Sequence, residues 1–184
     1  PPAASWSRFD AAAEEYRRVQ ARGTLLHQQE TLVEALTERG PGFWVMTPLQ
    51  VAGGIILINR GFVPPDLRQP ERRAAGQASG EVTVTGLLRP SEPNGRFLRA
   101  NRPGEDRWFS RDVQAIAQAR GLMPPVAPFF IDADGTANPG GYPIVGLTVV
   151  QFRNTHLVYA LTWFALAGLS LTGLYLLGRN GRAA

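Results

Sequence analysis

The sequence predicts a mostly β protein: a small, barrel-like antiparallel domain with one soluble helix, followed by a C-terminal transmembrane helix. Three observations lead to this prediction. Short runs of β-branched and aromatic residues recur between turns rich in Pro and Gly, one capped amphipathic segment interrupts them, and a long uncharged stretch closes the chain. We expect an extracytoplasmic β-rich domain at residues 1–153, a transmembrane helix at 154–178 and a cytoplasmic tail at 179–184.

The first half of the chain is expected to hold one short helix or turn and four strands. These are the turn at 9–16, a strand ending near residue 26, a weakly patterned strand at 30–36, and a hairpin of strands 42–51 and 54–63. The hairpin is the clearest of them, because two runs rich in β-branched and aromatic residues meet at Ala52-Gly53-Gly54, a strong turn sequence.

The second half alternates loops with shorter elements. The expected order is an exposed loop at 64–80, a strand at 80–90, a loop at 91–109, a helix at 110–122, a strand at 129–135 and a last strand at 144–152. Ser110 is the expected helix cap, and Gly121 is expected to end that helix. The loop at 64–80 is predicted from its Pro, Gly and charged residues, which show no periodic apolar face.

The closing stretch carries no formal charge from His156 to Gly178. As a helix it would be about 34 Å long, enough to cross a bilayer. A buried core helix of a soluble protein is the alternative, but such helices are usually shorter and have a polar face. Arg179 and Arg182 follow the stretch while Arg153 alone closely precedes it, which favours a cytoplasmic C-terminus. The chain begins with Pro1-Pro2, which indicates a processed protein or a fragment.

Composition excludes several functions. Residues 1–153 carry 17 basic and 15 acidic residues, and the rest of the net charge of +4 lies in the tail, so no nucleic-acid footprint is predicted. All 19 basic residues are arginines, which removes Schiff-base and lysine-base chemistry. With no cysteine there is no disulfide or thiolate metal site, and two histidines with two methionines are too few for an all-protein transition-metal site. A cofactor that needs one axial imidazole is still compatible with this composition.

Two motifs in the body could carry chemistry. Residues 129–136, FFIDADGT, resemble the start of haloacid dehalogenase phosphatases, in which Asp132 would be the nucleophile and Asp134 the acid. The likeness covers eight residues and the chain has no lysine, so a turn with an aspartate capping backbone amides is favoured. Arg60, after a hydrophobic strand, could bind an anionic group or pair with an acid at the strand end, and the structural interpretation is favoured.

His156 begins the uncharged stretch, and a helix would place Tyr159 and Trp163 on the same side at offsets of three and seven. One interpretation is an aromatic belt at the membrane interface with a hydrated histidine. The other is an imidazole that coordinates the iron of a haem, with the haem ring against Trp163 and Tyr159. The residues alone leave both open.

Six segments together resemble the surfeit locus protein one family of cytochrome c oxidase assembly factors. In chain order they are EYRRVQARG at 15–23, GFWVMTPLQ at 42–50, ILINRGFVP at 56–64, GEVTVTGLLRPSE at 80–92, NRPGEDRWFSRDV at 101–113 and NTHLVYALTWF at 154–164. The resemblance covers nearly the whole chain. It implies a β-rich extracytoplasmic domain held between two membrane helices, of which this sequence contains only the second.

The resemblance also implies a function. It implies a non-enzymatic factor that assists delivery or insertion of haem a into the large subunit of cytochrome c oxidase, with His156 as the haem ligand. The implied partners are that subunit, the lipid bilayer and haem a synthase. The implied location is a bacterial plasma membrane, with the main domain on the periplasmic side, or the mitochondrial inner membrane of a eukaryote. A cofactor-free chaperone that stabilises the nascent subunit through the β domain is the alternative.

Overall fold

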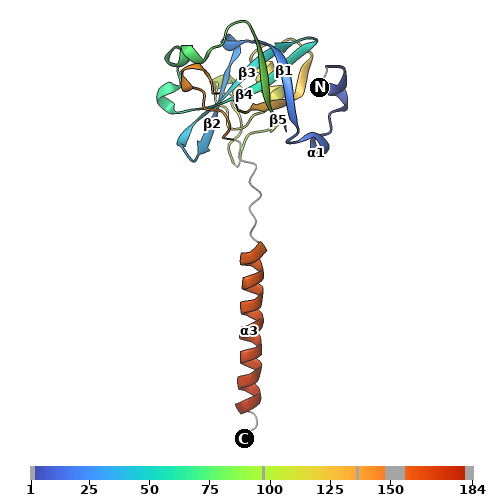
Figure 1. The fold of residues 1–184 in the computed structure, drawn as a ribbon, viewed down its shortest axis with the longest axis vertical. Helices are drawn as coiled ribbons and strands as arrows, with labels where there is room; N and C mark the ends of the chain where they lie inside the picture. Colours follow the sequence, from blue (N-terminus) through green and yellow to red (C-terminus); the bar gives the residue numbers. More distant parts are fainter. Residues whose placement is uncertain (1–2, 97, 136, 148–155, 181–184) are drawn as a thin grey trace. The chain divides into compact units, whose positions relative to one another are not determined.

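The computed structural model describes residues 3–96, 98–135, 137–147 and 156–180, with side chains described for 6–96, 98–135, 137–147 and 159–173. The chain divides into two units, Pro1–Thr148 and Val149–Ala184, each described here by itself. The first contains all the strands of the described residues, and the second contains one helix, α3 (His156–Asn180) (Figure 1).

The first unit is a closed β-barrel. Its strands within the described residues are β1 (Arg18–Leu25), β2 (Thr31–Thr37), β3 (Gly40–Val51), β4 (Gly54–Val63), β5 (Glu81–Pro90) and β6 (Val126–Ala133). They are bonded in the order β1-β5-β6-β4-β3-β2, and an additional β1–β3 pairing closes a ring of five strands that leaves β2 outside, on β3. The predicted mostly β, barrel-like fold is therefore confirmed.

One feature of the strand pairing differs from the prediction. The sheet is not wholly antiparallel, since β4 and β6 run parallel, with Asn59 opposite Asp132. Parallel neighbours need a long crossover, which here contains β5 and the helix α2 (Val113–Ala119). The hairpin of β3 and β4 is confirmed, with Val51 opposite Gly54.

Two apolar clusters lie on opposite faces of β4, which is buried along its whole length. Ile56 and Ile58 belong to the cluster inside the barrel, whereas Ile55 and Leu57 belong to the cluster beneath α2. Because neighbouring side chains of a strand point to opposite faces, a strand covered on both sides loses the polar alternation. This explains the continuous apolar run GIILI in the sequence.

The helix α2 lies where it was predicted, and Val113, Ile116 and Ala117 are buried as expected. Its cap was predicted wrongly. Asp112, not Ser110, is the N-cap, because its Oδ1 accepts a hydrogen bond from the Ala115 amide at 3.1 Å. The Ser110 hydroxyl instead donates to the Glu92 carbonyl at 2.7 Å. The short helix α1 (Ala11–Glu14) confirms the helix or turn predicted at 9–16.

The segment 64–80 was predicted as an exposed loop, and this was wrong in part. It forms two short 3-10 helices, η3 (Pro65–Leu67) and η4 (Pro70–Gly76), drawn in green in Figure 1. Arg73 and Gly76 of η4 are buried. A segment without an apolar face is nevertheless packed here, because polar contacts hold it to the barrel.

The strand predicted at 144–152 is found only at its first residue. Ile144 forms an isolated bridge to Phe62 of β4, with N···O distances of 2.8 and 2.9 Å. A Cβ at Gly61 would lie 2.2 Å from the Ile144 carbonyl oxygen, so this close approach requires glycine. Residues 145–147 are not strand, and the rest of the predicted strand lies outside the described residues.

The second unit contributes the described helix α3, which runs for 25 residues. Within the stretches that the structure describes, no helix combines the length and the hydropathy of a membrane-crossing segment. The transmembrane helix predicted at 154–178 therefore stays a prediction.

Candidate functional site

The predicted haem site maps to the start of α3. His156 is the first residue of the helix, and its side chain lies outside the described residues. Tyr159 and Trp163 stack edge to face, with ring centroids 6.2 Å apart and an angle of 71° between the rings. Both rings are exposed, at 67% and 58%. The structure thus pairs two of the three predicted side chains, and coordination by His156 stays a prediction.

The other histidine, His27, is hydrogen-bonded within the barrel. It begins the short 3-10 helix η2 (His27–Gln29), and its Nε2 lies 2.9 Å from the Ala78 carbonyl oxygen. A carbonyl only accepts, so Nε2 donates and Nδ1 is the acceptor for the Arg60 guanidinium at 3.3 Å. Burial, together with the charge of Arg60, lowers the pKa of His27. Both nitrogens of this neutral imidazole are therefore engaged within the barrel.

Arg60 is the centre of a polar cluster at the end of β4. Its side chain donates to the Gly76 carbonyl, to the Asn138 amide oxygen at 3.4 Å and to His27. Burial lowers the pKa of Arg60 to about 10, and the nearby charge of Arg73 acts in the same direction. Of the two roles considered for Arg60, pairing with an acid at the strand end is wrong within the described residues, where its partners are neutral.

A buried ion pair lies beside this cluster. Arg73 of η4 pairs with Glu30, which precedes β2, and their side chains are 1% and 8% exposed. Together with the contacts of His27 and Arg60, this pair fixes the 64–80 segment to the barrel. Neither Arg73 nor Glu30 could be singled out from the sequence, because an isolated charge in a polar segment shows the same pattern whether it is buried or solvated.

Asp132, the predicted phosphatase nucleophile, is buried in a second polar cluster. It accepts hydrogen bonds from Asn59 at 2.8 Å, Arg111 at 3.1 Å and Arg89 at 3.2 Å. The register of β4, β5 and β6 brings these groups together. Asp132 lies within β6, and the turn with a capping aspartate stays a prediction. A carboxylate neutralised by two arginines at 2% exposure is not presented to a substrate.

Arg111 joins Asp132 to the loop before α2. It also pairs with Glu92 and lies over the Phe130 ring, 4.7 Å from the centroid. Burial opposes ionisation of Glu92, but the hydrogen bond and charge of Arg111 outweigh it and lower the pKa of Glu92. Burial lowers the pKa of Arg111, but the carboxylates of Glu92 and Asp132 outweigh burial and raise it. The cluster links β5 and β6 to the loop before α2.

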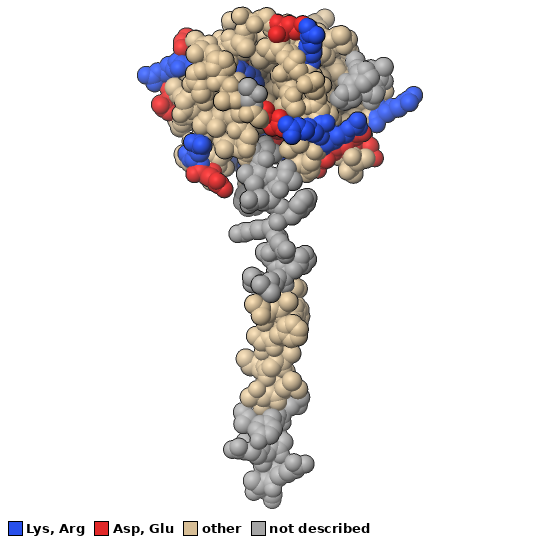
Figure 2. Space-filling model, in the orientation of Figure 1, with Lys and Arg blue, Asp and Glu red and all other residues tan. Residues whose placement is uncertain are grey.

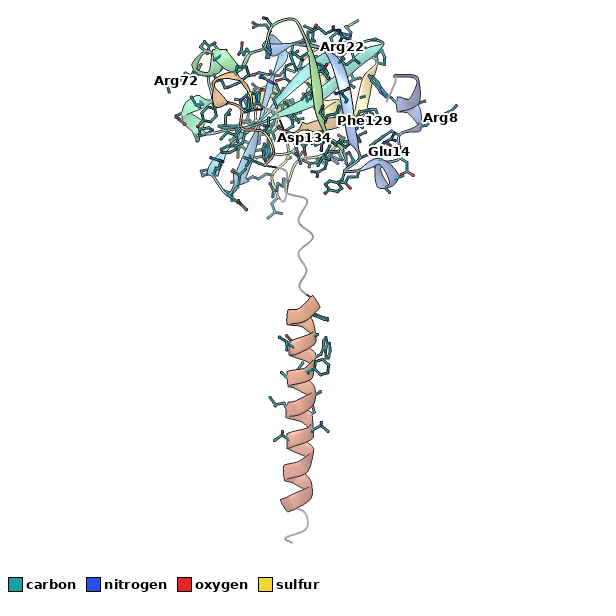
Figure 3. The ribbon with its side chains drawn as sticks, in the orientation of Figure 1. Arg8, Glu14, Arg22, Arg72, Phe129 and Asp134 are labelled. Atoms are coloured by element: carbon teal, nitrogen blue, oxygen red, sulfur yellow. The ribbon has the colours of Figure 1, made fainter. Side chains whose placement is uncertain are left out.

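Surface charge on the barrel unit is mixed in sign. Figure 2 shows acidic and basic side chains next to one another on the visible face, without a large patch of one sign. The exposed ion pairs of this unit include Arg22–Glu81 and Arg102–Glu105. Figure 3 labels several of these exposed charges, among them Arg22 on β1 and Arg72 on η4. Within the described residues no group of three His, Cys, Asp or Glu could hold a metal ion.

Together these features define a class of protein. Its members combine a small closed β-barrel, stabilised by buried arginine clusters, with a separate helix that has an exposed aromatic pair. The sequence model of the SURF1 family matches residues 1–168, and the chain belongs to this family. The family predicted from the sequence is thereby confirmed.

Individual relatives agree with this assignment. The SURF1-like protein of Monosiga brevicollis is 36% identical over 195 residues, which cover 98% of this chain and 73% of the relative. Surfeit locus protein 1 of Mus musculus is 38% identical over 169 residues, and that of Homo sapiens 37% over 171, each covering 83% of this chain. The aligned part is 54% of the mouse protein and 56% of the human one, so the chain spans little more than half of their length.

Proposed function

We propose that this protein is a membrane-bound assembly factor for cytochrome c oxidase that holds or guides haem a on its way to the large catalytic subunit. Membership in the SURF1 family supports the assembly role. One observation carries the haem proposal: both ring nitrogens of His27 are hydrogen-bonded within the barrel. His156 is then the imidazole that could serve as axial ligand.

The residues around His156 suit a haem cargo. An imidazole is a common axial ligand of haem iron, and a flat macrocycle packs well against aromatic side chains. Tyr159 and Trp163 present exposed rings one and two turns along the same helix. A single axial ligand also suits a carrier, because the cargo has to be released.

The proposed location is a membrane. The 23 uncharged residues from His156 to Gly178 support a crossing helix. Arg179 and Arg182 beyond it support a barrel on the periplasmic side of a bacterial plasma membrane, or the equivalent side of a mitochondrial inner membrane. The proposed partners are the oxidase large subunit and haem a synthase, within the bilayer. No enzymatic step is assigned, and the burial of Asp132 removes the support for a phosphatase.

A second function is favoured by one observation on the barrel. The strand β2 bonds to β3 on one side, while its other side carries the single bridge between Val33 and Trp108 among the described residues. A groove of about 330 Å³ lies there, lined by Leu36, Phe109 and Arg96 among others. Such an edge can bind an extended peptide. A cofactor-free chaperone would hold the nascent oxidase subunit in this way.

Complementation tests the assembly role and separates the two proposals. Cells that lack the protein are supplied with wild type, His156→Ala or Leu36→Asp, and the haem a content of the oxidase is measured in their membranes. The haem proposal predicts a loss with His156→Ala and wild-type content with Leu36→Asp. The reverse result favours the chaperone. Full oxidase content in the uncomplemented cells would contradict both.

A further inference from the structure

A cavity of about 230 Å³ lies at one end of the barrel, bounded by strands β1, β4, β5 and β6 and by residues 137–145. Its apolar walls include Ile58, Val84 and Ala133, which belong to or pack on the cluster inside the barrel. Arg60 and Asp134 also line it. A cavity that combines apolar walls with a few converging polar groups is typical of a small-molecule site.

Arg60 brings a buried positive charge to this cavity. The residue is 3% exposed, and no carboxylate lies within ion-pair distance of it among the described residues. Glu30 favours the charged form of Arg60 through its negative charge, but its carboxylate is paired with Arg73. A buried charge is costly unless an opposite charge compensates it. An anion in the cavity would supply that compensation.

The guanidinium of Arg60 still has hydrogen-bonding capacity. It carries five N–H groups, and three of them are donated to His27, Gly76 and Asn138. Two N–H groups therefore have no partner among the described residues. These are the Nε–H and one Nη1–H, which lie on different edges of the guanidinium, so a carboxylate can accept from one of them and pair with the positive charge.

Asp134 provides a complementary acceptor. Its Oδ2 pairs with Arg18 at 3.1 Å, whereas its Oδ1 is buried without a hydrogen-bond partner in the described part of the chain. A buried oxygen without a donor is costly, and a hydroxyl or ammonium group of a ligand would satisfy it. Figure 3 labels Asp134 on the barrel, just after the end of β6.

We propose that this cavity binds a small organic carboxylate, with the carboxylate on Arg60, a short aliphatic body against Ile58 and Val84, and a hydroxyl or ammonium group on Asp134. The volume is below the ~300–1,000 Å³ of drug-sized ligand sites, which limits the ligand to a small molecule. The apolar walls favour a carboxylate over inorganic phosphate, whose oxygens on every side would be left without donors. This site is separate from the proposed haem site on α3 and does not depend on it.

Calorimetric titration of the full chain in detergent tests the proposal, with γ-hydroxybutyrate as the probe. Butanediol, which has the same chain without the carboxylate, is the matched uncharged ligand, and inorganic phosphate is the competing anion. We expect γ-hydroxybutyrate to bind and butanediol not to bind. Arg60→Gln should weaken binding about tenfold or more, since it removes a charge-assisted pair. Arg22→Gln, at an exposed arginine of β1, should leave it unchanged.

Ala133→Leu provides a second variant, because Arg60 also helps to hold the 64–80 segment and its replacement could unfold the barrel. The larger side chain fills the cavity and leaves Arg60 in place, so binding should be lost while the barrel still unfolds cooperatively. Three results would overturn the proposal: no binding of γ-hydroxybutyrate to wild type, equal binding to folded Ala133→Leu, or binding of phosphate in its place.

Discussion

The arginines of this protein act in two ways that depend on their burial. Arg22 and Glu81 form an exposed pair, which water screens and which adds little to stability. Arg73 and Glu30 form a pair that is almost wholly removed from water. Breaking a buried pair is costly, because the remaining charge has neither a partner nor solvent. The contribution of ion pairs to the stability of this fold therefore depends on the few buried pairs and not on the total number of pairs.

Glu30→Gln tests this difference. The substitution keeps the shape of the side chain and leaves Arg73 buried without its counter-charge, so we expect the free energy of unfolding to fall by about 3–5 kcal/mol. Glu81→Gln makes the same chemical change in the exposed pair and should cost less than about 1 kcal/mol. Urea unfolding of both variants measures the two costs. Equal costs would contradict the structural role of the Arg73–Glu30 pair.

At the scale of elements, the 64–80 segment depends on the protonation of His27. Burial lowers the pKa of His27, as do the charges of Arg60 and Arg73, and these effects outweigh the hydrogen bond to Ala78 and the charge of Glu30, which raise it. The folded protein thus binds a proton on His27 less readily than the unfolded chain, whose pKa is near 6.5. The stability from the neutral imidazole is fully present above that value and falls as the pH drops below it.

The pH dependence is tested by comparing wild type with His27→Gln. Glutamine can donate to Ala78 and accept from Arg60 but does not titrate in this range, so the variant should lose less stability between about pH 7.5 and pH 5. Urea unfolding at the two pH values measures the difference. Parallel losses in both proteins would show that His27 does not control this part of the stability.

The helix α2 gives a second test at this scale. Asp112→Ala removes the acceptor for the Ala115 amide and should lower the free energy of unfolding by about 1 kcal/mol. Gln114→Ala, at an exposed position in the first turn of the same helix, is the matched control and should be close to neutral. Thermal unfolding of both variants checks the assignment of the cap. A larger loss for Gln114→Ala would contradict it.

The elements could be predicted where the pattern was local. The β3–β4 hairpin and α2 follow from apolar periodicity and turn residues within a few positions. The parallel pairing of β4 with β6 could not be predicted, because strand order depends on contacts between distant segments. The burial of Arg73 was missed for the same reason: its partner Glu30 is 43 residues away. Ser110 was mistaken for the cap because a hydroxyl two residues before Asp112 fits the same sequence pattern.

At the scale of the whole molecule, the barrel and the helix α3 have different parts in the proposed function. The barrel is stabilised by polar clusters around Arg60 and Asp132. The first engages the ring nitrogens of His27 in hydrogen bonds, and the second buries Asp132 away from any substrate. The helix carries His156, Tyr159 and Trp163. The sequence could point to these three residues because helical spacing is local. It could not decide between an interfacial belt and a haem site, since both need aromatic rings near a histidine.

The most direct test of the haem proposal is the visible spectrum of the full chain purified from cells that make haem a. We expect wild type to carry haem a, His156→Ala to lose it, and His27→Gln to keep it, because His27 is bonded within the barrel. His27→Gln is thus the matched control for removing one of the two histidines. Wild type purified without haem, or haem a retained equally by His156→Ala, would contradict the account.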